Sequence, residues 1–209
     1  MSTSKNRRFN IYSMVETAVL MAIIIIMGNT PLGTIVTPVL SVSIVTIPVA
    51  IAAITVGPIS GLICGATFGI NSCIRAFMGL GGLTTALSVI NPAALIFTTV
   101  VTRALDGLLV GFIFKLLHDK CKLKKLSYYL AAVCTPLLNT LFFMTCLVVF
   151  FYNSEPIQNL VTKLGAANPF MFVILLVGIQ GLIEAAAGLI IGGAVSHTLS
   201  YAINRHNSR

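Results

Sequence analysis

Long stretches almost free of charged residues constrain this sequence more than any other feature. Of its 209 residues, 57% are hydrophobic and only 9% are charged, and the mean hydropathy is +1.00. A helix that crosses a bilayer needs about 20 mostly apolar residues, and a water-soluble domain of this size has no need of so many. The sequence therefore predicts an integral protein of the cell membrane with no separate soluble domain.

The apolar stretches predict a single integral membrane domain over residues 1–209. Gly57-Pro58 turns one stretch directly into the next, and Asn91-Pro92 opens another, because proline suits the first turn of a helix. We expect an all-α membrane protein, a compact bundle of six transmembrane helices. The expected spans are approximately 12–27, 43–56, 59–77, 91–117, 126–151 and 170–203.

Basic residues predict the orientation of this bundle. The net charge is +8, and most Lys and Arg residues lie at the two termini and in the loop between the fourth and fifth spans. Under the positive-inside rule, these three segments are cytoplasmic, and six crossings place both termini on that side. The clustering also argues against a nucleic-acid partner, which would need basic residues on a folded polar face.

Three connections then fall outside the cell, at residues 28–42, 78–90 and 152–169. They contain little charge and many Gly, Pro, Asn, Ser and Thr residues. Connections in compact bundles are usually shorter, so these loops could form a lid over an external pocket. The alternative is that external loops simply tolerate such sequences.

Small residues predict where helices approach closely, because lipid provides no hydrophobic drive between helices. Gly61, Gly65 and Gly69 form a GxxxGxxxG stripe in the third span, which indicates packing within the bundle. Ala18 and Ala22 form AxxxA in an otherwise bulky first span. That notch could receive a helix of another subunit.

Charged residues inside predicted spans are costly and suggest function. Arg103 and Asp106 are three positions apart and share a helix face, so they could neutralise each other or bind a substrate. Glu184 could join the same network. Arg75 lies in the last turn of the third span with no acid nearby in sequence, which suits either an anionic ligand or the external headgroups.

Neutral polar side chains could complete a pocket at this level. Each alone more often makes a helix-to-helix hydrogen bond than a ligand contact, but their distribution over four spans, mostly in the middle or outer half of the bilayer, supports a binding site. The candidates for substrate binding are Asn71, Arg75, Asn91, Arg103, Asn139 and Gln180.

Several motifs are missing. The sequence contains no phosphate-binding loop, no pair of His residues at metal-ligand spacing and no Ser/His/Asp set that helices could assemble. We therefore expect no catalytic residue, no metal and no cofactor bound by this chain. A membrane protein without a phosphate-binding loop could still move a solute if it takes energy from partner subunits or from an ion gradient.

The chain resembles the substrate-binding S components of energy-coupling-factor (ECF) vitamin transporters. The resemblance covers nearly the whole chain and rests on the six predicted spans, on Ala18 and Ala22, and on two segments, IPVAIAAITVGPISGLICGATFGINS (47–72) and NPAALIFTTVVTRALDGLLVG (91–111). The second pattern, an NP-initiated helix with an internal Arg, is typical of the pantothenate-type branch. One departure is Thr102, because that branch often has Pro before the Arg.

This resemblance implies a division of labour between proteins. In the family, the first helix docks through AxxxA on a membrane coupling protein (the T component), two cytoplasmic ATPases use ATP, and the S component topples to release its vitamin. Ala18 and Ala22 would be the docking residues. The residues near the external pocket would be Asn71, Arg75, Asn91 and Arg103.

The leading substrate is pantothenate, a small vitamin. Its carboxylate suits Arg75 or Arg103, and its amide and hydroxyls suit Asn and Gln side chains. Other vitamins or precursors remain alternatives. A stand-alone secondary transporter, in which Glu184 and Asp106 relay protons, is the main rival class.

Overall fold

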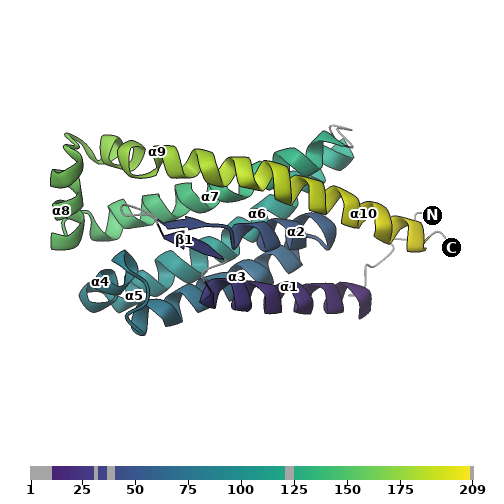
Figure 1. Cartoon of the computed structure of the whole chain (residues 1–209), viewed down its shortest axis with the longest axis horizontal. Coiled ribbons are helices and arrows are strands. Elements are labelled where there is room, and N and C mark those ends of the chain that lie inside the picture. Colours follow the sequence, from purple (N-terminus) through teal and green to yellow (C-terminus); the bar gives the residue numbers. More distant parts are fainter. Residues whose placement is uncertain (1–10, 31–32, 37–40, 121–124, 208–209) are drawn as a thin grey trace, which may run out of the picture.

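The computed structural model describes residues 11–30, 33–36, 41–120 and 125–207. These residues form an elongated bundle of helices with one short antiparallel ribbon, in which Thr34 pairs with Ser43 (Figure 1). In chain order the elements are α1 (Ile11–Asn29), β1 (Thr34–Val36), β2 (Ser41–Ser43), α2 (Thr46–Thr55), α3 (Pro58–Phe77), α4 (Leu83–Ile90), α5 (Pro92–Ile96), η1 (Phe97–Val101), α6 (Thr102–Lys115), η2 (Leu116–Lys120), α7 (Leu126–Phe151), α8 (Glu155–Leu164), α9 (Pro169–Ala187), η3 (Gly188–Gly192) and α10 (Gly193–Asn207).

Proline and its preceding residue start α3 and α5. Gly57 has a φ of 134°, which favours glycine, and lets α2 turn sharply into α3 at Pro58. Asn91 caps α5, since its Oδ1 accepts a hydrogen bond from the backbone N–H of Ala94 at 3.0 Å. The helix predicted to open at Asn91-Pro92 is therefore confirmed.

The glycine stripe of α3 packs against the helical run η1–α6. A Cβ atom on Gly61 would collide with the carbonyl of Gly107, and one on Gly65 would collide with the carbonyl of Arg103. At Gly69 the same atom would lie 2.5 Å from the carbonyl of Thr99. The partners recede by four residues as α3 advances by four, as in an antiparallel pair. The predicted internal packing by this stripe is confirmed.

Four helices in the described part of the chain are long and apolar enough to cross a membrane. They are Ile11–Asn29, Pro58–Phe77, Leu126–Phe151 and Gly181–Tyr201. A fifth crossing results if Glu155–Leu164 and Pro169–Gly178, which meet at a 75° bend, form one broken span. The helical run 92–120, in which the π-helical segments η1 and η2 alternate with α5 and α6, is not among them. The chain is therefore a helical membrane protein, and the count of six crossings stays a prediction.

Helix α2 lies where the second span is expected, and it has only 10 residues. At 1.5 Å per residue it reaches about 15 Å, half the thickness of a hydrocarbon core of about 30 Å. Its residues from Thr46 to Ile54 are all buried. Packed between α1, α3, α6 and α7, α2 forms an internal part of the bundle.

The two ends of the bundle differ. Helix α1 begins and α10 ends at one end, whereas α4, α5 and α8 lie at the other (Figure 1). The expectation of irregular loops at residues 78–90 and 152–169 is wrong, because these segments contain α4 and α8. These segments are helical because each is amphipathic and buries its apolar face. Leu87 and Ile157, both 0% exposed, join one apolar cluster with Leu147 and Phe172.

Candidate functional site

A half-buried arginine, whose Nε and Nη1 atoms are buried, forms the centre of the candidate site. Arg103 is the second residue of α6, directly after the π-helical turn η1, a feature that often marks functional positions. Its guanidinium carbon lies 4.2 Å from the ring centroid of Phe68 on α3 and 5.8 Å from that of Phe143 on α7. Contacts of this kind hold a guanidinium in place through the negative face of the ring.

Asp106 follows Arg103 by three positions and is 2% exposed. Among the residues that the structure describes, neither Nε nor Nη1 of Arg103 has a hydrogen-bond partner, and neither does Oδ1 of Asp106, although all three atoms are buried. A buried polar atom without a partner costs about 1–3 kcal/mol, and more when it carries charge. The pair therefore presents unused donors and an unused acceptor side by side.

Glu184 brings a second carboxylate into this group. It lies on α9, is 4% exposed and accepts a hydrogen bond from the backbone N–H of Ser43 in β2 at 2.7 Å. Asp106 and Glu184 both interact electrostatically with Arg103, Asp106 the more strongly. The hydrogen bond to Ser43 also joins the β-ribbon to the helix that carries Glu184.

Two more predicted site residues lie on the helices that surround this group. Asn139 is 9% exposed on α7, one turn before Phe143 and on the same face. Gln180 belongs to α9, and its side chain lies outside the described residues. Asn139 is therefore placed to face the neighbourhood of Arg103.

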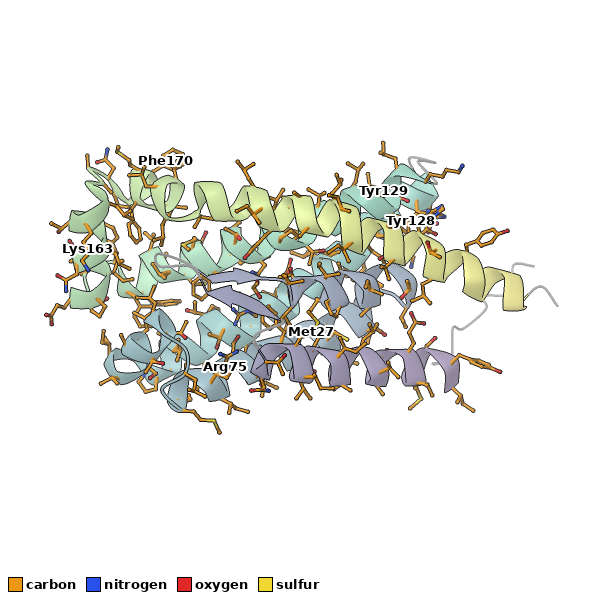
Figure 2. All side chains as sticks on the ribbon, viewed as in Figure 1. Met27, Arg75, Tyr128, Tyr129, Lys163 and Phe170 are labelled. Carbon is orange, nitrogen blue, oxygen red and sulfur yellow. The ribbon has the colours of Figure 1, made fainter. Side chains whose placement is uncertain are left out.

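Asn71 and Arg75 instead hold the end of α1. Arg75 donates to the carbonyl of Gly28 and, at 3.5 Å, to that of Leu80, while Asn71 accepts from Nδ2 of Asn29 at 2.9 Å. Figure 2 shows Arg75 beside the end of α1 that carries Met27. A cation suits the carbonyl end of a helix. The structure thus gives both residues a local structural role, with partners that the sequence did not indicate.

Asn91 lies apart from the other candidates. It is exposed, and its side chain caps α5. The structure therefore separates the predicted set into a group around Arg103, a group at the end of α1, and this cap. Phe68, Phe143 and the N–H of Ser43 are the partners that sequence reasoning missed. Aromatic rings in apolar spans, and a backbone group, carry no polar signal.

Helix α1 has two distinct faces. Thr17, Leu20, Ile24 and Gly28 are buried. Thr17 also donates to the hydroxyl of Ser60 on α3 at 2.9 Å. The other face is exposed and apolar, and both alanines of the AxxxA pair, Ala18 and Ala22, lie on it. The notch is therefore open on the outside of the bundle.

Comparison with known proteins gives one positive finding. The family model described as the ECF transporter substrate-specific component matches residues 12–195, most of the chain. A search of curated proteins finds no match. The matched range includes α1, the glycine stripe, Arg103, Asp106 and Glu184.

Proposed function

This chain belongs to the family of ECF transporter substrate-specific components, and from that premise we propose that it is the high-affinity binding subunit of an importer for a water-soluble vitamin, with pantothenate as the substrate. Members of the family are transport subunits and not enzymes, and this one is a multi-pass protein of the cell membrane. They bind a small molecule and work with a T component and ATPases. The family match over residues 12–195 carries the proposal.

The group around Arg103 supports a small polar substrate. Pantothenate has a carboxylate, an amide and hydroxyls, and the buried side chains offer guanidinium donors and a carboxylate acceptor without partners. Asn139 adds an amide on the neighbouring helix. Sites of this kind pair an apolar lining, provided here by Phe68 and Phe143, with few polar groups that fix orientation. Asn71, Arg75, Asn91 and Gln180 remain proposed contributors to the same binding function.

We further propose six crossings with both termini in the cytoplasm. The end of the bundle with α4, α8 and the β-ribbon then faces outward and closes the pocket from outside. The two ends of Figure 1 suit this orientation, because the start of α1, the end of α10 and the start of α7 after the basic loop lie together.

The exposed notch of α1 is the proposed docking surface for the coupling protein. Two alanines on an apolar helix face allow another helix to approach closely, which is a main source of association in lipid. We propose that two cytoplasmic ATPases use ATP to drive this partner, that the chain itself binds no cofactor, and that release follows toppling of the bundle.

A binding screen tests the proposal. The purified protein in detergent is heated with each water-soluble vitamin in turn, since a ligand at 100 times its Kd stabilises the folded state by about 2.7 kcal/mol. We expect pantothenate to raise the melting temperature without ATP. Uptake in cells should require co-expressed coupling protein and ATPases. Uptake driven by a proton gradient in liposomes that contain this chain alone would instead support a secondary transporter.

A further inference from the structure

The open atoms of Arg103 and Asp106 define what kind of group can bind there. Nε and Nη1 of Arg103 are donors, Oδ1 of Asp106 is an acceptor, and all three are buried with no hydrogen-bond partner in the described part of the chain. The two residues are three apart on α6 and so lie on one helix face. A ligand group that satisfies both side chains must accept hydrogen bonds on one side and donate one on the other.

The charges nearby disfavour an anion at this position. Arg103, Asp106 and Glu184 carry a formal net charge of −1 when all are ionised, and a ligand carboxylate would add another negative charge. Like charges repel strongly where the dielectric is low. Asp106 in particular, three positions from Arg103 on α6, would repel a carboxylate that bound Arg103 with both oxygens. A neutral group adds no charge and still fills the open hydrogen-bond positions.

The surroundings hold the pair ready for such a group. The backbone of Arg103 packs on Gly65, and the face of the Phe68 ring lies 4.2 Å from the guanidinium carbon. The guanidinium is thus restrained before a ligand arrives, which lowers the entropy cost of binding.

We propose that Arg103 and Asp106 together bind a carbonyl with an adjacent N–H, as in an amide, lactam or ureido group of the vitamin. The carbonyl accepts from Arg103 and the N–H donates to Asp106. In pantothenate this group is the central amide, so the carboxylate lies away from the pair. The inference rests on the proposed function and makes Asp106 a binding residue that determines specificity.

Two ligand analogues test this on the unmodified protein, so folding of a variant does not enter. The first is panthenol, in which an alcohol replaces the carboxylate and the amide stays. The second is the ester analogue of pantothenate, in which oxygen replaces the amide N–H. Calorimetry in detergent gives each Kd. We expect panthenol to bind within about threefold of pantothenate and the ester to bind at least about tenfold more weakly, the cost of one charge-assisted hydrogen bond.

A variant then assigns the effect to the acid. In Asp106→Ala the acceptor is absent. The Kd of the ester divided by that of pantothenate should therefore fall to about 1, whatever the change in overall affinity. The preference should persist in Asp119→Ala, which changes an acid in η2 at the other end of this helical run. An unchanged preference in Asp106→Ala overturns the assignment.

Failure of the inference can be told apart from failure of the proposed function. If pantothenate and its ester analogue bind and panthenol does not, the proposed function holds, and the proposed amide contact is contradicted. Binding of a different vitamin that has no carbonyl next to an N–H also overturns it. If no vitamin binds, the proposed function itself is contradicted, and the inference with it.

Discussion

Glycines of α3 let this helix approach the run η1–α6 closely, and Gly65 among them bears on where Arg103 lies. Gly65 allows the carbonyl of Arg103 to come so near α3 that no Cβ could fit between them. The position of the charged side chain therefore depends on a residue with no side chain. Helices in lipid gain stability from such close contact, since burial of apolar surface contributes little there.

Replacing Gly65 tests this dependence. In Gly65→Ala the added Cβ meets backbone atoms of Arg103, which cannot move like a flexible side chain. We expect a loss of about 1–3 kcal/mol of stability, typical of overpacking, and a lower melting temperature in detergent. Gly178→Ala is the matched control, because nothing lies within 4 Å of the added atom. Equal melting temperatures for the two variants would contradict the packing account.

Asn91 offers a second test at the scale of one residue. Asn91→Ala removes the acceptor for the N–H of Ala94 and should cost about 1 kcal/mol of stability, whereas Asn91→Ser keeps a capping oxygen and should retain most of it. Melting temperatures and vitamin affinity are measured on both. If Asn91→Ser keeps its stability but loses affinity, the side chain contacts the substrate and does more than cap α5.

Sequence reasoning placed individual residues on helix faces but could not assign their partners. The stripe of Gly61, Gly65 and Gly69 was predicted correctly, because small residues at this spacing have one main use in lipid. Arg75 was predicted to contact a ligand because no acid lies near it in sequence, and Asn71 because polar side chains are distributed over four predicted spans. Their partners are Asn29 and the carbonyl of Gly28, more than 40 residues away. Such pairings depend on tertiary structure.

At the scale of elements, α1 has one face buried in the bundle and another that is exposed. Its buried face bonds to α3 through Thr17 and Ser60, and its exposed face carries Ala18 and Ala22. A change on the exposed face should therefore leave the substrate site intact. This separation makes binding and transport independently measurable.

We expect Ala22→Leu to abolish uptake in cells with the coupling proteins while vitamin binding to the purified subunit is unchanged. The larger side chain fills the notch that a partner helix would enter. Val19→Leu is the control, since Val19 is also exposed on α1 but lies outside the AxxxA pair, and it should retain uptake. Loss of binding in Ala22→Leu would show that α1 shapes the substrate site instead.

The long apolar helices were the easiest elements to predict and the short ones the hardest. Helices α1, α3 and α7 follow long, mostly apolar stretches. Helices α4 and α8 have 8 and 10 residues. Their turn-forming residues resemble those of loops, and they are stable because they bury Leu87 and Ile157 against the bundle. Tertiary packing decides such short helices.

At the scale of the whole molecule, the two ends differ in charge and in cover. Tyr128, near the start of α7, contacts His197 of α10 with a ring-centroid distance of 5.2 Å, so the start of α7 lies beside the C-terminal helix. Lys163 lies at the opposite end, on α8 (Figure 2). The proposed orientation puts the first end inside the cell and the second outside. Positive charge on the inner side satisfies the rule that sets membrane topology.

Cysteine labelling in whole cells tests this orientation. In a background without the five native cysteines, Lys163→Cys on α8 should react with a membrane-impermeant maleimide in intact cells. Lys125→Cys, exposed just before α7, should react only after permeabilisation. Labelling of both positions from outside would mean that α7 does not cross the membrane between them. Labelling of Lys125→Cys alone would reverse the orientation, and the end covered by α4 and α8 would then face the cytoplasm, where it could not admit a vitamin from outside.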